Sequence, residues 1–155
     1  MPDDVSAARE TRVSETPPGE PIVSRQGPGR LLIGIYTVFA VAACARATWQ
    51  IATDFDAAPL AYSLSALAGL IYLVAAIGIA RPDNTSHVVA AVSCAVELAG
   101  VLAVGGFSLI RPDLFPEATV WSHFGEGYGY VPLILPVLGL LWLRKVRRST
   151  AGERD

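Results

Sequence analysis

The chain has 155 residues, of which 52% are hydrophobic and only 17% charged, and its formal net charge is −2. Soluble domains usually carry about 25% charged residues, and the apolar residues here stand in long blocks rather than in an amphipathic period. The composition therefore favours a small polytopic membrane protein over a soluble domain. The slightly negative charge argues against a nucleic-acid partner.

Residues 1–30 are rich in Pro, Gly and charged side chains and have no apolar period, so we expect a disordered cytoplasmic tail. Gly and Pro at 27–29 are expected to break any helix there. The first apolar run, 31–53, exceeds the roughly 20 residues that a crossing needs, and Arg46 is its only charge. The letters VAAC ending at Cys44 also fit a bacterial lipoprotein signal, but the apolar run continues beyond Cys44, so we expect an uncleaved and unlipidated helix.

The second run, 59–80, and the third run, 86–110, contain many small residues, which allow membrane helices to approach closely. Glu97 is the one charge of the third run. The triplet Arg-Pro-Asp follows both runs, at 81–83 and 111–113. It places a cation at the negative end of each helix and then a residue that cannot continue it, so we interpret it as a helix stop used twice.

The loop after the third run is long and ends in a glycine-rich stretch. We expect one or two helical turns within 116–125, lying at the membrane interface with Trp121 and Phe124 at headgroup level. The fourth run, 128–143, is the shortest, and we expect Pro132 and Pro136 to bend or loosen it. A basic cytoplasmic tail, 145–155, is expected to follow.

Charges alternate between the loops. The stretches before the first run, between the second and third runs and after the fourth run carry most of the arginines and the lysine, whereas the other two loops are acidic and have Arg111 as their one cation. The positive-inside rule then places both termini in the cytoplasm of a bacterial inner membrane. The fold class predicted is all-α, a four-transmembrane-helix bundle over 31–144 with a short interfacial helix in the last external loop.

Arg46 and Glu97 are the charges that lie deepest in the predicted spans. A charge in the membrane costs roughly 2.5–3.5 kcal/mol on insertion scales, so such residues usually face a partner or the bundle interior. Three interpretations remain open. The two residues form a structural ion pair; or Arg46 extends to the outer surface while Glu97 is protonated or hydrogen-bonded to Ser93 or another neighbour; or they form a transport or proton-relay pair.

An external acidic cluster is the second candidate site. Asp54, Asp56, His123 and Glu126, together with Asp113 and Glu117, supply ligand types that divalent cations use. Their spacing matches no metal motif, so we expect ordinary acidic loops with no metal, no cofactor and no catalytic residue. We expect no enzyme; a membrane enzyme would have to use His123 and Glu126 as its acid–base pair.

Three segments, DFDAAPLAYSLSALAGLIYLVA, ELAGVLAVGGFSLIRPDLFPEATVW and SHFGEGYGYVPLILPVLGLLWLR, resemble a group of small actinobacterial integral membrane proteins. The resemblance covers 31–144 and implies four spans and a bacterial source, but no activity and no site residue.

Beside the lipid bilayer itself, the expected partners are further copies of the chain or a larger membrane complex. We expect an accessory or scaffolding subunit that packs against such a partner through the small-residue faces of 59–80 and 86–110. The alternative is a small ion- or proton-coupled transporter with Glu97 as its coupling residue.

Overall fold

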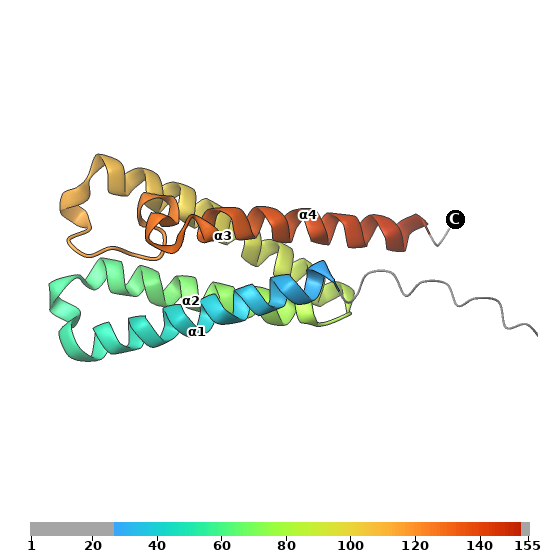
Figure 1. The fold of residues 1–155 in the computed structure, drawn as a ribbon, viewed down its shortest axis with the longest axis horizontal. Helices are drawn as coiled ribbons and strands as arrows, with labels where there is room; N and C mark the ends of the chain where they lie inside the picture. Colours follow the sequence, from blue (N-terminus) through green and yellow to red (C-terminus); the bar gives the residue numbers. More distant parts are fainter. Residues whose placement is uncertain (1–26, 153–155) are drawn as a thin grey trace, which may run out of the picture.

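The computed structural model describes residues 27–152, and in this range all regular structure is helical. Its elements are α1 (Pro28–Asp54), η1 (Phe55–Ala57), α2 (Pro59–Ala80), α3 (Asn84–Ile110), η2 (Pro112–Leu114), η3 (Ser122–Tyr128) and α4 (Val131–Gly152). The four long helices run back and forth along one axis (Figure 1). The start of α1, the α2–α3 connection and the end of α4 share one end, here called the proximal end; η1, η2 and η3 lie at the distal end. The predicted all-α class is confirmed.

Three helices, α1, α2 and α3, are each long and apolar enough to cross a membrane. The fourth candidate is a pair, η3 and α4, bent by 98°. Residues 131–143, the apolar part of α4, extend about 20 Å at 1.5 Å per residue, which is shorter than the roughly 30 Å of a hydrocarbon core. The fourth predicted crossing is therefore a bent element rather than one continuous apolar helix.

The observed helix bounds correct the predicted ones at the start of α1 and at the end of α4. α1 begins at Pro28, so the expected helix break at 27–29 is wrong: proline suits the first turn, where its missing N–H has no partner anyway. Gly29 lies against the Trp142 ring, where a Cβ would come within 2.7 Å. Of the predicted tail, residues 1–26 lie outside the described residues. The basic residues after 143 continue α4 as far as Gly152, so they form helix rather than tail, and 153–155 lie outside the described range.

Prolines do not interrupt α4. Pro132 lies in its first turn and Pro136 in its interior, and both side chains are buried. The sharp bend comes earlier, at Gly129 and Tyr130, which both adopt left-handed backbone with φ of 61° and 60°. The expected bend thus exists, but the residues before the helix make it.

Both Arg-Pro-Asp triplets end a helix as predicted. The backbone N–H groups of Arg81 and Arg111 donate to the carbonyl oxygens of Ile77 and Phe107. The aspartates then differ. Asp83 caps the start of α3, where Oδ2 accepts from Ser86 N at 2.8 Å and Oδ1 from Ser86 Oγ at 2.9 Å, and these bonds lower its pKa. Asp113 instead accepts two hydrogen bonds from the Arg111 guanidinium, at 2.9 and 2.7 Å, which lower the pKa of Asp113.

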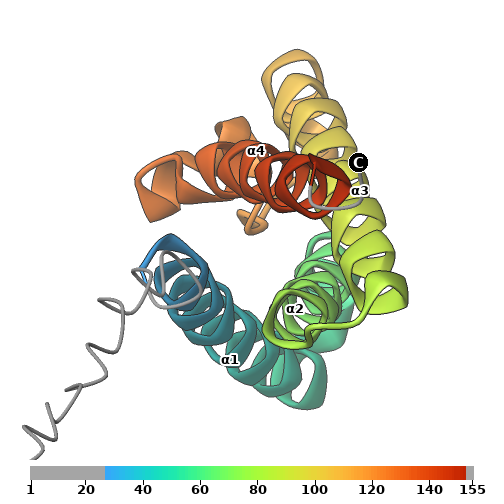
Figure 2. The same ribbon diagram turned by 90° about the vertical axis from the view of Figure 1, so that its right-hand side faces the viewer.

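Each helix packs mainly on its neighbour in sequence, and the four surround a common axis, with α4 returning beside α1 (Figure 2). Small residues make the closest contacts. A Cβ at Gly69 of α2 would lie 2.6 Å from Cys44 Sγ in mid-α1, and one at Gly78 would lie 2.9 Å from Ala90 Cβ of α3. The small residues that we expected to receive a partner are therefore largely used inside the bundle.

Candidate functional site

The loop before α4 turns back into the bundle. Residues 119–128, here called the re-entrant segment, pack along α3: a Cβ at Gly100 would lie 2.8 Å from the Trp121 ring, and one at Gly105 would lie 2.6 Å from the Phe124 ring. Gly100 is about 15 Å from the distal end of α3, at 1.5 Å per residue. Trp121 is only 3% exposed. Trp121 is thus buried inside the bundle, because Gly100 of α3 leaves room for its ring, and its position relative to the membrane headgroups stays a prediction.

We expected one or two helical turns within 116–125; residues 116–121 are not helical, and the observed turn, at 122–128, overlaps only the end of that range. Its backbone is unusual, because His123, Phe124 and Gly125 have φ of 50°, 59° and 81°. Left-handed backbone costs an L-residue about 1–2 kcal/mol, so packing and hydrogen bonds must stabilise this turn. The expected interfacial helix is replaced by a strained turn.

Side-chain oxygens satisfy much of this irregular backbone. Thr119 Oγ1 accepts from the N–H groups of Trp121 and Ser122 at 3.0 and 2.9 Å, and Ser122 Oγ accepts from Thr119 N at 2.9 Å. From α3, Ser108 Oγ accepts from His123 N at 2.8 Å. Non-helical backbone at membrane depth is tolerated where protein supplies such partners. The segment is thus built to lie inside the bundle.

Glu97 lies at the centre of the bundle on the inward face of α3, and its side chain is 0% exposed. Tyr36 of α1 donates its O–H to Glu97 Oε2 at 2.9 Å. Cys94 Sγ lies 3.3 Å from the same hydroxyl and can donate to it. Glu97 Oε1 and the Tyr72 hydroxyl have no hydrogen-bond partner among the described residues. We call Tyr36, Tyr72, Cys94 and Glu97 the Glu97 centre.

Every long helix contributes to this centre. The Tyr72 ring of α2 lies 6.1 Å from the Tyr36 ring. In α4, Gly139 comes so close that a Cβ there would be 2.9 Å from Cys94 Sγ and 3.4 Å from the Tyr36 hydroxyl. Within 27–152 no cation pairs with Glu97. Because an unpaired charge in such surroundings is costly, the geometry favours a neutral Glu97 carboxyl.

The structure does not bring Arg46 and Glu97 together. Arg46 is exposed on α1, and its Nη1 donates to Tyr128 Oη at 2.7 Å. The ion-pair interpretation is therefore wrong. The second interpretation describes Glu97 correctly, since the residue accepts a hydrogen bond from a neighbour, but that neighbour is Tyr36.

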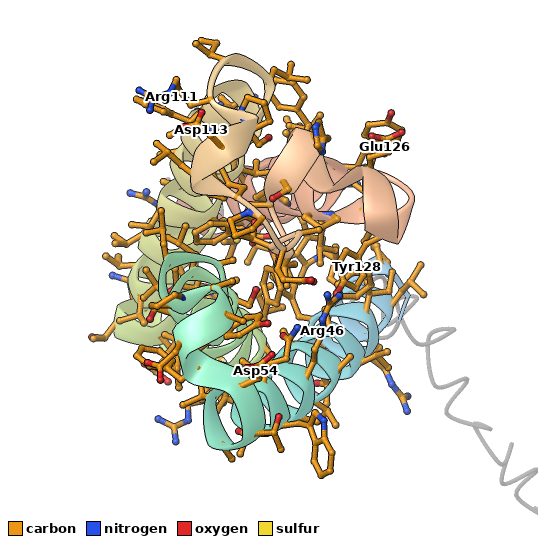
Figure 3. All side chains as sticks on the ribbon, turned by 90° about the vertical axis from the view of Figure 1, so that its left-hand side faces the viewer. Arg46, Asp54, Arg111, Asp113, Glu126 and Tyr128 are labelled. Atoms are coloured by element: carbon orange, nitrogen blue, oxygen red, sulfur yellow. The ribbon has the colours of Figure 1, made fainter. Side chains whose placement is uncertain are left out.

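The acidic cluster is also not assembled. Figure 3 shows Asp54 and Glu126 on opposite sides of the distal end, with Arg46 and Tyr128 between them. Asp56 and His123 are exposed, on η1 and η3. In the described part of the chain, no three His, Cys, Asp or Glu side chains gather as metal ligands would.

Sequence reasoning did not identify the hydrogen-bond partners of the two charges within the apolar runs, which are Tyr36 for Glu97 and Tyr128 for Arg46. A signal for Tyr36 existed: it shares a three- and four-residue spacing with Leu32, Ala40, Ala43 and Ala47, the buried face of α1. Arg46 stands next to that stripe rather than on it. No comparable pattern identifies Tyr128, because its position depends on the re-entrant turn.

No protein-family model, curated protein or solved structure matches this chain. A function must therefore be inferred from the Glu97 centre and the re-entrant segment.

Proposed function

We propose that the chain is a multi-pass protein of a bacterial cytoplasmic membrane with four crossings and both termini in the cytoplasm. Large apolar side chains on the outward faces of α1, α2 and α3 are exposed, as lipid contact requires. Among residues 27–152, the proximal end carries Arg81 and the basic residues that follow residue 143, whereas the distal end carries most of the acids. This distribution supports a cytoplasmic proximal end.

Within that membrane, we propose a small proton-coupled carrier with Glu97 as its coupling residue. The observation that carries this proposal is a fully buried carboxyl that has one hydrogen-bond donor, one free oxygen and no cation among the described residues. Intramembrane acids of this kind are rare, and in pumps and transporters they bind and release protons. A residue needed only for packing would be better replaced by an apolar one.

The re-entrant segment supplies the element that such a carrier has to move. Carriers use interrupted crossings to open a buried site alternately to each side. Here the interrupted crossing is joined to the bundle through the Ser108–His123 and Arg46–Tyr128 hydrogen bonds. Displacing it toward the distal side would open a route to Glu97, so the present arrangement corresponds to a closed state.

An accessory subunit is the second candidate. The inward small residues are occupied, but α1 has an outward face with Gly34 and Ala45, and nothing lies within 4 Å of a Cβ at Gly34. A partner helix could approach there closely. This surface favours a homo-oligomer or a larger membrane complex without requiring any chemistry at Glu97.

Reconstitution into liposomes separates the two candidates. With a pH-sensitive dye inside and a Na⁺ or K⁺ gradient across the membrane, the carrier proposal predicts proton movement that Glu97→Gln abolishes. Glu126→Gln is the matched control, since Glu126 is an exposed carboxyl at the distal end, and it should leave the movement unchanged. Equal rates for wild type, Glu97→Gln and protein-free liposomes refute the carrier. Stoichiometric co-purification of a larger membrane protein, unaffected by Glu97→Gln, would support the accessory role.

A further inference from the structure

An apolar groove opens on the side of the bundle between α1 and the re-entrant segment. Its volume is about 230 Å³, and Val38, Phe39, Ala42, Ala43, Val120 and Tyr128 line it. Val38 is 64% exposed, so one rim of the groove faces outward. In the proposed membrane orientation this rim faces lipid, not water.

The size of the groove limits what it can hold. One turn of helix, about 10 Å wide and 5.4 Å long, occupies about 400 Å³, so the groove accepts less than one turn of a partner helix. Pockets for drug-sized ligands typically measure about 300–1,000 Å³. A segment of one flexible hydrocarbon chain, with the rest of the chain leaving through the open rim, suits this smaller apolar space better than either.

The only intramembrane cation of α1 lies at the distal end of this groove. Arg46 follows Ala42 by one helical turn and bonds Tyr128, which also lines the groove. The guanidinium has five N–H donors, and the Tyr128 bond is its one hydrogen bond within the described residues. Asp54, Glu117 and Arg46 all lie near the Tyr62 hydroxyl. Neither acid, however, forms an ion pair with Arg46. An anion can therefore still reach Arg46, although the nearby acids disfavour a multiply charged one.

We propose that the groove and Arg46 together bind one phospholipid of the distal leaflet with a single negative charge, of the phosphatidylglycerol kind. One acyl chain lies in the groove, and the phosphodiester accepts hydrogen bonds from the free side of the Arg46 guanidinium. The site requires no transport activity, so it does not depend on the carrier proposal.

The test uses the full-length protein, delipidated in detergent and transferred to bilayer nanodiscs of phosphatidylcholine containing a minor fraction of phosphatidylglycerol. Lipid that remains with the protein on extraction is counted by native mass spectrometry. Wild type should retain phosphatidylglycerol about tenfold over its share of the bilayer, in line with a charge-assisted hydrogen bond. Arg46→Gln should remove this preference, and Arg46→Lys should preserve most of it. Inorganic phosphate should not compete, because it lacks the chain.

Matched variants test the groove itself. Ala42→Leu places bulk in the groove and should reduce retention of either lipid, whereas Ala45→Leu alters an exposed alanine of the same helix outside the lining and should not. Arg111→Gln, which removes a distal arginine already paired with Asp113, should also have no effect. Equal enrichment of the two lipids in wild type, or an unchanged preference in Arg46→Gln, overturns the proposal. If Ala42→Leu does not accumulate, the Arg46 series alone decides.

Discussion

The hydrogen bond from Tyr36 to Glu97 gives the sharpest test of the Glu97 centre. Tyr36→Phe keeps the ring but removes the only donor to the carboxyl among the described residues, and also the hydroxyl beside Cys94. Both carboxyl oxygens are then buried without a partner, since Oε1 already lacks one. Leaving a buried acceptor unsatisfied costs about 1–3 kcal/mol, while hydrogen bonds measured in membrane bundles average about 0.6 kcal/mol. We therefore expect a loss of about 1–2 kcal/mol.

Tyr72→Phe is the matched control. Tyr72 is as fully buried as Tyr36, and the two rings touch, but the Tyr72 hydroxyl makes no hydrogen bond of normal geometry within the described chain, although the Trp121 side chain lies beside it. Removing an unsatisfied buried hydroxyl should leave stability unchanged or raise it. Only Tyr36→Phe should therefore lower stability, a difference that a general dependence on aromatic packing would not produce.

The measurement is unfolding in mixed micelles as the fraction of denaturing detergent rises, followed by circular dichroism, with Glu97→Leu completing a double-mutant cycle. Tyr36→Phe should cost little once Glu97 is leucine, giving a coupling energy of about 1 kcal/mol. Additive effects of the two substitutions, or equal losses for Tyr36→Phe and Tyr72→Phe, would refute the described geometry of the Glu97 centre.

Three further predictions concern the re-entrant segment and a helix end. Gly100→Val should displace Trp121, lowering stability by about 1–3 kcal/mol and shifting tryptophan fluorescence, whereas Gly106→Val, which has open space around it, should do neither. His123→Gly should stabilise the fold by about 1 kcal/mol by relieving left-handed backbone; a loss in thermal unfolding would contradict this assignment. Asp83→Ala should destabilise the fold at neutral pH. The pKa of Asp83 is lowered in the folded state, so its contribution is present above the ordinary value of 3.8 and lost as the pH falls through the folded value. Melting curves of wild type and variant should therefore converge in acid, and a gap independent of pH would argue against the charged cap.

The helical part of the fold was predictable because hydropathy and helix-stop chemistry are local. The run 59–80 has the same bounds as α2, and both Arg-Pro-Asp triplets end a helix where expected. Errors of two or three residues at the starts of α1 and α3 arise because the helices extend beyond their apolar parts: α1 has Pro28 in its first turn, and α3 follows the Asp83 cap. The predicted fourth helix ended too early for the same reason: the basic last turns of α4 are helical although they are not apolar.

The candidate site was not predictable in the same way, because it depends on contacts between distant segments. Arg46 and Glu97 are lone charges in two apolar runs, which suggested that they could pair, but helix rotation decides which residues meet, and Arg46 lies beside the inward stripe of α1 rather than on it. Tryptophan is a typical interfacial anchor, which predicts a position at the membrane surface for Trp121; only its contact with Gly100, on another element, explains why it is buried. Local patterns carry no information on that pairing.

Phe39 lies between the two proposed sites, the lipid groove and the Glu97 centre. Its ring lies 6.1 Å from Tyr128 on one side and 6.1 Å from Tyr72 on the other, so it separates the groove from the Glu97 centre. Val120 and Tyr128 form one wall of the groove only while the re-entrant segment is in place. A lipid chain in the groove therefore binds the closed arrangement preferentially, and a ligand shifts an equilibrium by its differential affinity for the two states. If both proposals hold, enriching the bilayer in the anionic lipid should slow proton movement in wild type but not in Arg46→Gln. Faster movement in both proteins would show that lipid in the groove does not hold the re-entrant segment in place.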